Sequence, residues 1–180
     1  MRKILFGLII TTIAFSCKNA EVKSATDTKD TTAAATKPAV DLPYTADYES
    51  NWSDNVSDAD LKMVLTTYKD WADGNMPGLE AALADTTTID MSSGTHIRKP
   101  KADIINMWKT NRDSLSSVKI KMDAWHKMYA TDKGDAYVVT WYNEYDTYKN
   151  GRVDSAAYHD INQIKDGKLV WYSQYKRPLK

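Results

Sequence analysis

One acidic side chain in the predicted strand before the last hairpin is expected to face the interior of the domain. Ile164 of that strand is expected to face the core, and the two-residue period of a strand then turns Tyr158, Asp160 and Asn162 to the same side. Burial raises the pKa of a carboxyl, which makes Asp160 a candidate pocket acid. A bulge would shift the period by one residue, and His159 would then point inward in its place.

Two predicted hairpin turns extend this inward face to the neighbouring strands. A two-residue turn at Asn150-Gly151 sets Trp141 opposite Asp160. A second such turn at Asp166-Gly167 sets Trp171 opposite the next inward residue. The expected pocket comprises Trp141, Asn143, Tyr158, Asp160, Asn162 and Trp171, with Tyr68 and Trp108 as walls, and the expected outward set is Tyr142, His159, Tyr172 and Gln174. Two indoles beside a carboxyl and two amides would hold a polar head group while the rings pack on an apolar body.

Three other side chains are weighed as catalytic candidates. Asp90 ends a short predicted strand, and it either reaches the pocket mouth through a bulge or caps backbone amides at the loop. His126 lies on the apolar face of a strand that alternates from Ile120 to Met128, as a hydrogen-bonded core residue or as a pocket member. His159 takes the role of Asp160 if the register shifts by one residue.

Metal, cofactor and nucleic-acid sites are not expected. The chain's 3 histidines lie in separate segments without a pair at ligand spacing, and no P-loop, dinucleotide fingerprint or G-x-S-x-G element is present. The chain has 24 basic and 24 acidic residues, so it offers no excess of positive charge to neutralise phosphates.

The elements that must position these side chains come in the order helices, then strands. A first helix is predicted from a Ser57 cap to Gly74, a short second helix begins near Pro77, and a third begins at Pro100. Strands are predicted over residues 87–91, 118–129, 136–148, 154–164 and 168–176. This order predicts a single α+β domain with an antiparallel meander, over residues 48–180.

The N-terminus resembles that of a bacterial lipoprotein. Arg2 and Lys3 precede an apolar run that is too short to span a bilayer as a helix but fits a secretory signal, and Ala14-Phe15-Ser16-Cys17 resembles a lipobox. Cys17, the only cysteine, is the expected lipidation site at the end of a 1–17 signal, so the membrane contact would be through lipid alone. Residues 18–47 are rich in Ala, Thr, Lys and Asp and are expected to form a disordered tether.

The order of motifs in the folded part is similar to that of NTF2-like domains of the SnoaL and ketosteroid-isomerase type. The similarity rests on Tyr68 to Asn75, Leu79 to Asp85, Ile89-Asp90 and Asp166 to Trp171. It implies a cone-shaped α+β fold in which about three N-terminal helices pack on a strongly curved antiparallel sheet around a pocket, and a possible homodimer through the outer sheet face.

The same resemblance implies where catalytic groups would lie. In the isomerases of this family a base follows the first strand, and Met91 occupies the matching position, while Asp160 matches a second acid. The expected function is therefore binding of a small, partly apolar molecule near the cell envelope, without a complete catalytic set. Two alternatives stay open, namely an isomerase, dehydratase or cyclase, and a lipoprotein that contacts other proteins.

Overall fold

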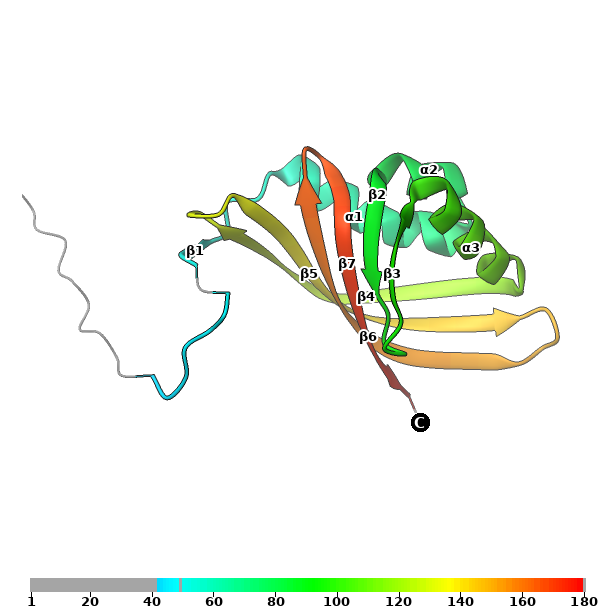
Figure 1. Cartoon of the computed structure of the whole chain (residues 1–180). Helices are drawn as coiled ribbons and strands as arrows, with labels where there is room; N and C mark the ends of the chain where they lie inside the picture. Colours follow the sequence, from blue (N-terminus) through cyan, green and yellow to red (C-terminus); the bar gives the residue numbers. More distant parts are fainter. Residues whose placement is uncertain (1–41, 49, 180) are drawn as a thin grey trace, which may run out of the picture. The chain divides into compact units, whose positions relative to one another are not determined.

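The computed structural model describes residues 42–48 and 50–179 (Figure 1). The helices are α1 (Asp58–Asp73), α2 (Met76–Ala82) and α3 (Lys101–Asp113). The strands are β1 (Trp52–Ser53), β2 (Leu83–Asp90), β3 (His96–Pro100), β4 (Leu115–Ala130), β5 (Asp135–Tyr148), β6 (Val153–Lys165) and β7 (Lys168–Pro178). The predicted signal, Cys17 and most of the predicted tether lie outside the described residues. The helices within the described part of the chain are too short or too polar to cross a bilayer.

The ends of α1 are set by side chains that the sequence places there. The hydroxyl of Ser57 accepts a hydrogen bond from the Asp60 backbone N–H over 3.0 Å, which satisfies one free donor of the first turn. Gly74 ends the helix in the left-handed region, with φ of 73°, and its N–H turns back to the Trp71 carbonyl. Asn75 then caps α2 by accepting from the Gly78 N–H. Both predicted helix boundaries are confirmed.

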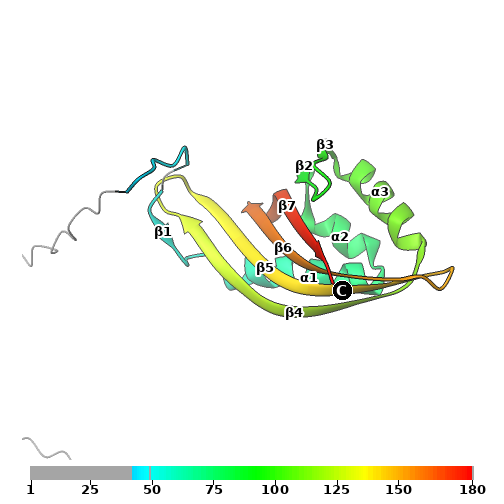
Figure 2. The same ribbon diagram turned by 90° about the horizontal axis from the view of Figure 1, so that it is seen from below.

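The seven strands form one curved sheet in the order β1-β4-β5-β6-β7-β2-β3. The three helices lie on the concave side of this sheet, as Figures 1 and 2 show. The core fills the space between the two layers, and its fully buried side chains include Val64, Ile89, Ile104 and Val138. The predicted α+β architecture is confirmed. It differs from the prediction in two respects: β2 runs parallel to β7, so the sheet is mixed, and the short strands β1 and β3 were not predicted.

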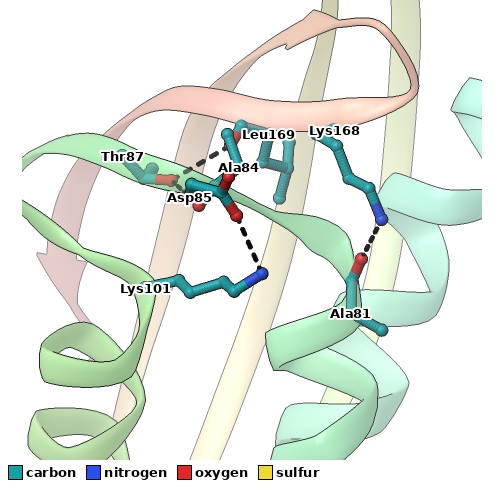
Figure 3. Close-up of polar contacts among 7 residues, drawn as sticks. All are labelled: Ala81, Ala84, Asp85, Thr87, Lys101, Lys168 and Leu169. Atoms are coloured by element: carbon teal, nitrogen blue, oxygen red, sulfur yellow. Dashed lines mark hydrogen bonds and ion pairs between the residues drawn. The ribbon is translucent and has the colours of Figure 1, made fainter.

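Polar side chains fasten the parallel junction between β2 and β7 (Figure 3). The buried hydroxyl of Thr87 donates to the Leu169 carbonyl over 3.1 Å. The ammonium group of Lys168 donates to the Ala81 carbonyl in the last turn of α2 over 2.5 Å, where helix carbonyls lack intrahelical partners. These bonds tie the end of α2 and the start of β2 to the last strand.

The hairpin between β5 and β6 differs from its predicted register by one residue. A two-residue type I′ turn requires positive φ at both central residues, and here only Gly151 has it, at 86°. Tyr148 instead bonds with Arg152 across a three-residue loop, which places Thr140, not Trp141, opposite Asp160. The second turn follows the prediction, with φ of 51° at Asp166 and 69° at Gly167.

Two register irregularities, one between β6 and β7 and one in β4, change which side chains face the helices. Lys165 pairs with Lys168 as predicted, but a shift in the β6–β7 ladder just beyond sets Tyr172, not Trp171, opposite Asn162. A second shift, in β4 between Met122 and Ala124, reverses which residues face the helices. Met122 packs on the core before this bulge, while His126 beyond it faces away and is exposed.

Candidate functional site

A cavity of about 440 Å³ lies between the helices and the concave face of the sheet. Its exposed lining residues Asn111 and Ser114, at the end of α3, mark the mouth where the cavity reaches solvent. The aromatic lining residues are Tyr68, Trp71, Trp108, Tyr142, Tyr148, Tyr158 and Tyr172. The polar lining residues other than tyrosine are Thr67, Asn111, Ser114, Glu144, Asp146, Asp160, Asn162 and Gln174.

Asp160 of β6 lines the cavity and is only 1% exposed. Its Oδ2 accepts hydrogen bonds from the Tyr142 hydroxyl over 3.0 Å and from the Tyr68 hydroxyl over 3.2 Å. Asn162 donates to the Tyr68 oxygen over 3.1 Å, and the Thr140 hydroxyl lies 2.7 Å from the same oxygen, so the phenol belongs to a buried polar network. Oδ1 of Asp160 is buried and has no protein partner. Burial raises the pKa of Asp160 to about 7, against the effect of the tyrosine hydrogen bonds.

Glu144 and Asp146 continue the acidic lining from the floor toward the mouth. They lie two residues apart on β5, so both face the cavity. Burial raises the pKa of Glu144 to about 8, the neighbouring Asp146 carboxylate adds to the rise, and the Trp71 indole opposes it. Burial also raises the pKa of Asp146, whose Oδ1 again has no partner. Among the described residues, no three His, Cys, Asp or Glu side chains are grouped so that they could hold a metal ion.

Packed tyrosines separate these acidic positions. The ring of Tyr142 stacks on Tyr158 with a centroid distance of 5.1 Å and meets Tyr68 edge-on at 4.9 Å. On the opposite side, Trp108 of α3 meets Tyr172 of β7 edge-on at 6.5 Å. The walls are thus aromatic faces and edges that stand beside buried carboxyl groups.

The structure brings five of the predicted pocket residues to the cavity: Tyr68, Trp108, Tyr158, Asp160 and Asn162. Trp141 and Asn143 instead face the outer side, because the three-residue loop moves the β5–β6 register by one residue. Trp141 stacks on His159 there, with a centroid distance of 4.9 Å, and Asn143 donates to Asp123 over 2.5 Å. The expectation that these two side chains point inward is wrong for that reason.

The remaining candidates also lie outside the cavity lining. Trp171 faces away because of the shift in the β6–β7 ladder, and its indole N–H donates to Asp90 over 2.6 Å. The other carboxylate oxygen of Asp90 lies 2.5 Å from Nδ1 of His96, so both oxygens of Asp90 are engaged at the β2–β3 hairpin. His126 is exposed on the outer face beyond the β4 bulge. Met91 does line the cavity, which places a thioether where the family resemblance implies a base.

Sequence reasoning missed the other half of the site. Tyr142, Tyr172 and Gln174 line the cavity although they were expected to face outward. Glu144 and Asp146 also line the cavity and were not predicted to do so. Once Tyr142 is known to face inward, the two-residue period of a strand places both of them on the same side. One sequence signal favours the observed register. Lys149, Asn150 and Gly151 together fit a three-residue hairpin loop with glycine in the left-handed position, which is the most common type after the two-residue turn.

Comparisons with known proteins identify the fold. No family model matches the chain, and no curated protein matches it in sequence. Among solved structures, an epoxide hydrolase of M. tuberculosis described as LEH-like matches with a TM-score of 0.56 and 11% identity, over 66% of this chain and 83% of that one. An NTF2-like protein of unknown function from Burkholderia pseudomallei matches with a TM-score of 0.54 and 14% identity, over 67% of this chain and 92% of that one.

A putative polyketide cyclase from Xanthomonas campestris matches with a TM-score of 0.52 and 17% identity, over 65% of this chain and 89% of that one. At these identities the likeness concerns the fold alone. The chain therefore has the NTF2-like fold, an α+β cone of three helices on a curved, unclosed mixed sheet.

Proposed function

We propose that the protein is a lipid-anchored binding protein of the bacterial cell envelope, whose NTF2-like domain holds a small, partly apolar molecule in the cavity. The observation that supports this proposal most strongly is that Oδ1 of Asp160 has no hydrogen-bond partner, although it is buried in a cavity of about 440 Å³ with aromatic walls. A buried polar atom without a partner is costly, so a ligand that supplies a hydrogen-bond partner gains affinity there. The volume lies within the roughly 300–1,000 Å³ typical of small-molecule sites.

The carboxyl groups in the cavity favour binding over acid–base catalysis. Catalysis of that kind uses two groups whose pKa values are pushed apart, so that one holds a proton and the other accepts it. Here burial raises the pKa of Glu144, Asp146 and Asp160 alike. Met91 stands where the family resemblance implies a base, and its thioether cannot take up a proton.

A second candidate function, an acid–base enzyme, draws support from one observation. The pKa of Asp160 is about 7, which suits a group that exchanges protons near neutral pH. The two candidates differ in the fate of the occupant, because a binding protein returns it unchanged. Incubating the purified protein with any compound extracted from it, followed by mass spectrometry, separates them.

The lipid anchor is the second part of the proposal and is supported by sequence alone. Cys17 follows a short basic segment and an apolar run, in the position that a lipoprotein signal requires. A tether of the composition of residues 18–47 would hold the domain away from the bilayer surface. The protein would then meet its ligand outside the cytoplasm.

Bound small molecules detected by native mass spectrometry test the binding function. The mature chain is purified as wild type and as Asn111→Trp, in which an indole at the mouth obstructs the cavity. Asn106→Trp is the matched control, because Asn106 is exposed on the same helix and does not line the cavity. We expect a small molecule on the wild type and the control but not on Asn111→Trp. A wild type without any bound molecule, or equal occupancy in all three proteins, contradicts the proposal.

A further inference from the structure

The charges in the cavity are all of one sign. Three carboxyl groups line it, and no lysine, arginine or histidine is among its lining residues. The nearby guanidinium of Arg112 donates instead to the backbone carbonyls of Trp71 and Ala72, over 3.0 and 2.9 Å, and to that of Leu115 over 3.3 Å. Lys176 is exposed, and its ammonium lies 5.6 Å from the centroid of the Tyr158 ring. The protein itself thus places no cationic side chain in the cavity to balance its acids.

Two of these acids have oxygens that are ready to accept a hydrogen bond. Asp160 is 99% buried and aimed into the cavity, and its Oδ1 has no partner while its Oδ2 has two. Oδ1 of Asp146 is likewise buried and unpartnered. Unpaired buried acceptors are rare in folded proteins, and each of these two is an acceptor that an occupant of the cavity can satisfy.

The walls suit a positively charged occupant with an apolar body. The electron-rich faces of tryptophan and tyrosine attract ammonium groups, most strongly where water is excluded. The same faces pack well against methylene groups. Seven aromatic side chains around three carboxyls provide both contacts, with no donor-rich cationic patch that an anion would need.

The acids occupy two levels of the cavity. Thr140 lies opposite Asp160, and Glu144 follows four residues farther along β5, with the Tyr142–Tyr158 pair between the two levels. At about 3.4 Å per residue, the two levels are roughly 14 Å apart along the strand. An occupant that reaches both levels has polar ends and an apolar middle.

We propose that the cavity binds a linear aliphatic amine with two or more ammonium groups, one near Glu144 and Asp146 and another near Asp160. The proposal rests on the binding function above and names the chemical class of its ligand. The apolar chain between the ammonium groups would lie along the tyrosine pair. Binding of a cation would also relieve the cost of ionising three neighbouring buried carboxyls.

Four eight-carbon probes of matched length test this class by isothermal titration calorimetry on the mature chain. They are 1,8-diaminooctane, octylamine, 1,8-octanediol and octanedioate, which differ mainly in charge. We expect the diamine to bind at least tenfold more tightly than the diol, octylamine to fall between them, and octanedioate not to bind. If the diol or octanedioate binds as tightly as the diamine, the amine class is wrong while the binding function stands.

Neutral variants identify the groups responsible. Combining Glu144→Gln with Asp160→Asn should weaken diamine binding at least tenfold and diol binding much less, because the two amides keep hydrogen-bonding oxygens and lose only the charge. The matched control combines Glu80→Gln with Asp103→Asn, two exposed acids outside the cavity lining. Unchanged diamine affinity in the cavity double variant overturns the proposal, as does failure of both amines to bind the wild type. Native mass spectrometry of bound molecules tests the binding function independently of this amine class.

Discussion

Tyr142 and Asp160 are joined across neighbouring strands by a hydrogen bond of 3.0 Å from the phenol to Oδ2. Tyr68 of α1 donates to the same oxygen, so the helix layer and the sheet meet at one carboxyl group. Because both bonds use Oδ2, the second oxygen remains available to an occupant. In the proposed function, the structural contacts of Asp160 and its contact with a ligand would therefore lie on separate atoms.

This division predicts different effects for two substitutions of Asp160. Asp160→Asn keeps a carbonyl oxygen that accepts from Tyr68 and Tyr142, and we expect the free energy of unfolding at pH 7 to change by less than about 1 kcal/mol. Asp160→Ala leaves both hydroxyls without this acceptor and should lower it by about 1–3 kcal/mol. Urea denaturation of both variants measures the difference. An equal loss in the two variants would show that the charge itself holds the structure together.

Glu144 predicts a pH dependence of stability. Its pKa is about 8 in the folded protein and near 4.5 in the unfolded chain, so between these values the folded state holds a proton that the unfolded state has lost. The stabilisation is complete below pH 4.5 and is lost as pH rises toward 8. Asp146 and Asp160 repel the charged form of Glu144, and Lys176 and Trp71 favour it.

The variant Glu144→Gln should remove the part of this dependence that comes from Glu144, while Asp146 and Asp160, whose pKa values are also raised, keep theirs. We expect it to raise the free energy of unfolding by about 1–3 kcal/mol at pH 8.5, where the wild type buries a charge, and to change it little at pH 5. Denaturation curves at both values check the prediction, with Glu80→Gln as an exposed control. A gain of equal size at pH 5 and pH 8.5 would exclude ionisation of Glu144 as its cause.

Local sequence signals were sufficient for much of the fold. Ser57, Gly74 and Pro77 place the helix ends through capping and backbone preferences that act over a few residues. Asp166-Gly167 likewise sets its turn by backbone conformation alone. The parallel pairing of β2 with β7 joins segments about 80 residues apart in the chain, and no local pattern encodes it.

The site was only partly predictable, because side-chain direction along a strand depends on every turn and bulge before it. Asp160 and Asn162 were placed inward correctly, since they share a strand with Ile164. Trp141 and Trp171 were placed wrongly by one residue each, because their positions depend on the loop after Tyr148 and on a bulge in the β6–β7 ladder. An error of one residue in the register turns the neighbouring side chain inward, so Tyr142 and Tyr172 line the cavity in place of Trp141 and Trp171.

The stacked pair of Trp141 and His159 on the outer face should act independently of the cavity. A double-mutant cycle with Trp141→Ala and His159→Ala should give a coupling energy of about 0.5–1.5 kcal/mol. Binding of 1,8-diaminooctane should be the same in Trp141→Ala as in the wild type. Loss of that binding would show that the outer face communicates with the cavity.

Lipidation of Cys17 predicts where the protein is found. Cys17→Ser should release the chain from the membrane fraction, because the acyl chains on this residue are the proposed anchor. Fractionation after a salt and carbonate wash measures the release, and the mass of the product shows whether the signal is still removed. An exported and processed Cys17→Ser chain that still sediments with membranes would exclude this anchor.

The parallel ladder between β2 and β7 sets an order for folding during synthesis. Leu83 and Thr88 find their partners only when Leu169 and Trp171 have emerged from the ribosome. The last strand also contributes Tyr172 and Gln174 to the cavity, so no shorter nascent chain contains the complete site. Such long-range pairing delays folding until the whole domain is available. Until β7 joins the sheet, the edges of β6 and β2 that pair with it have backbone groups open to other chains.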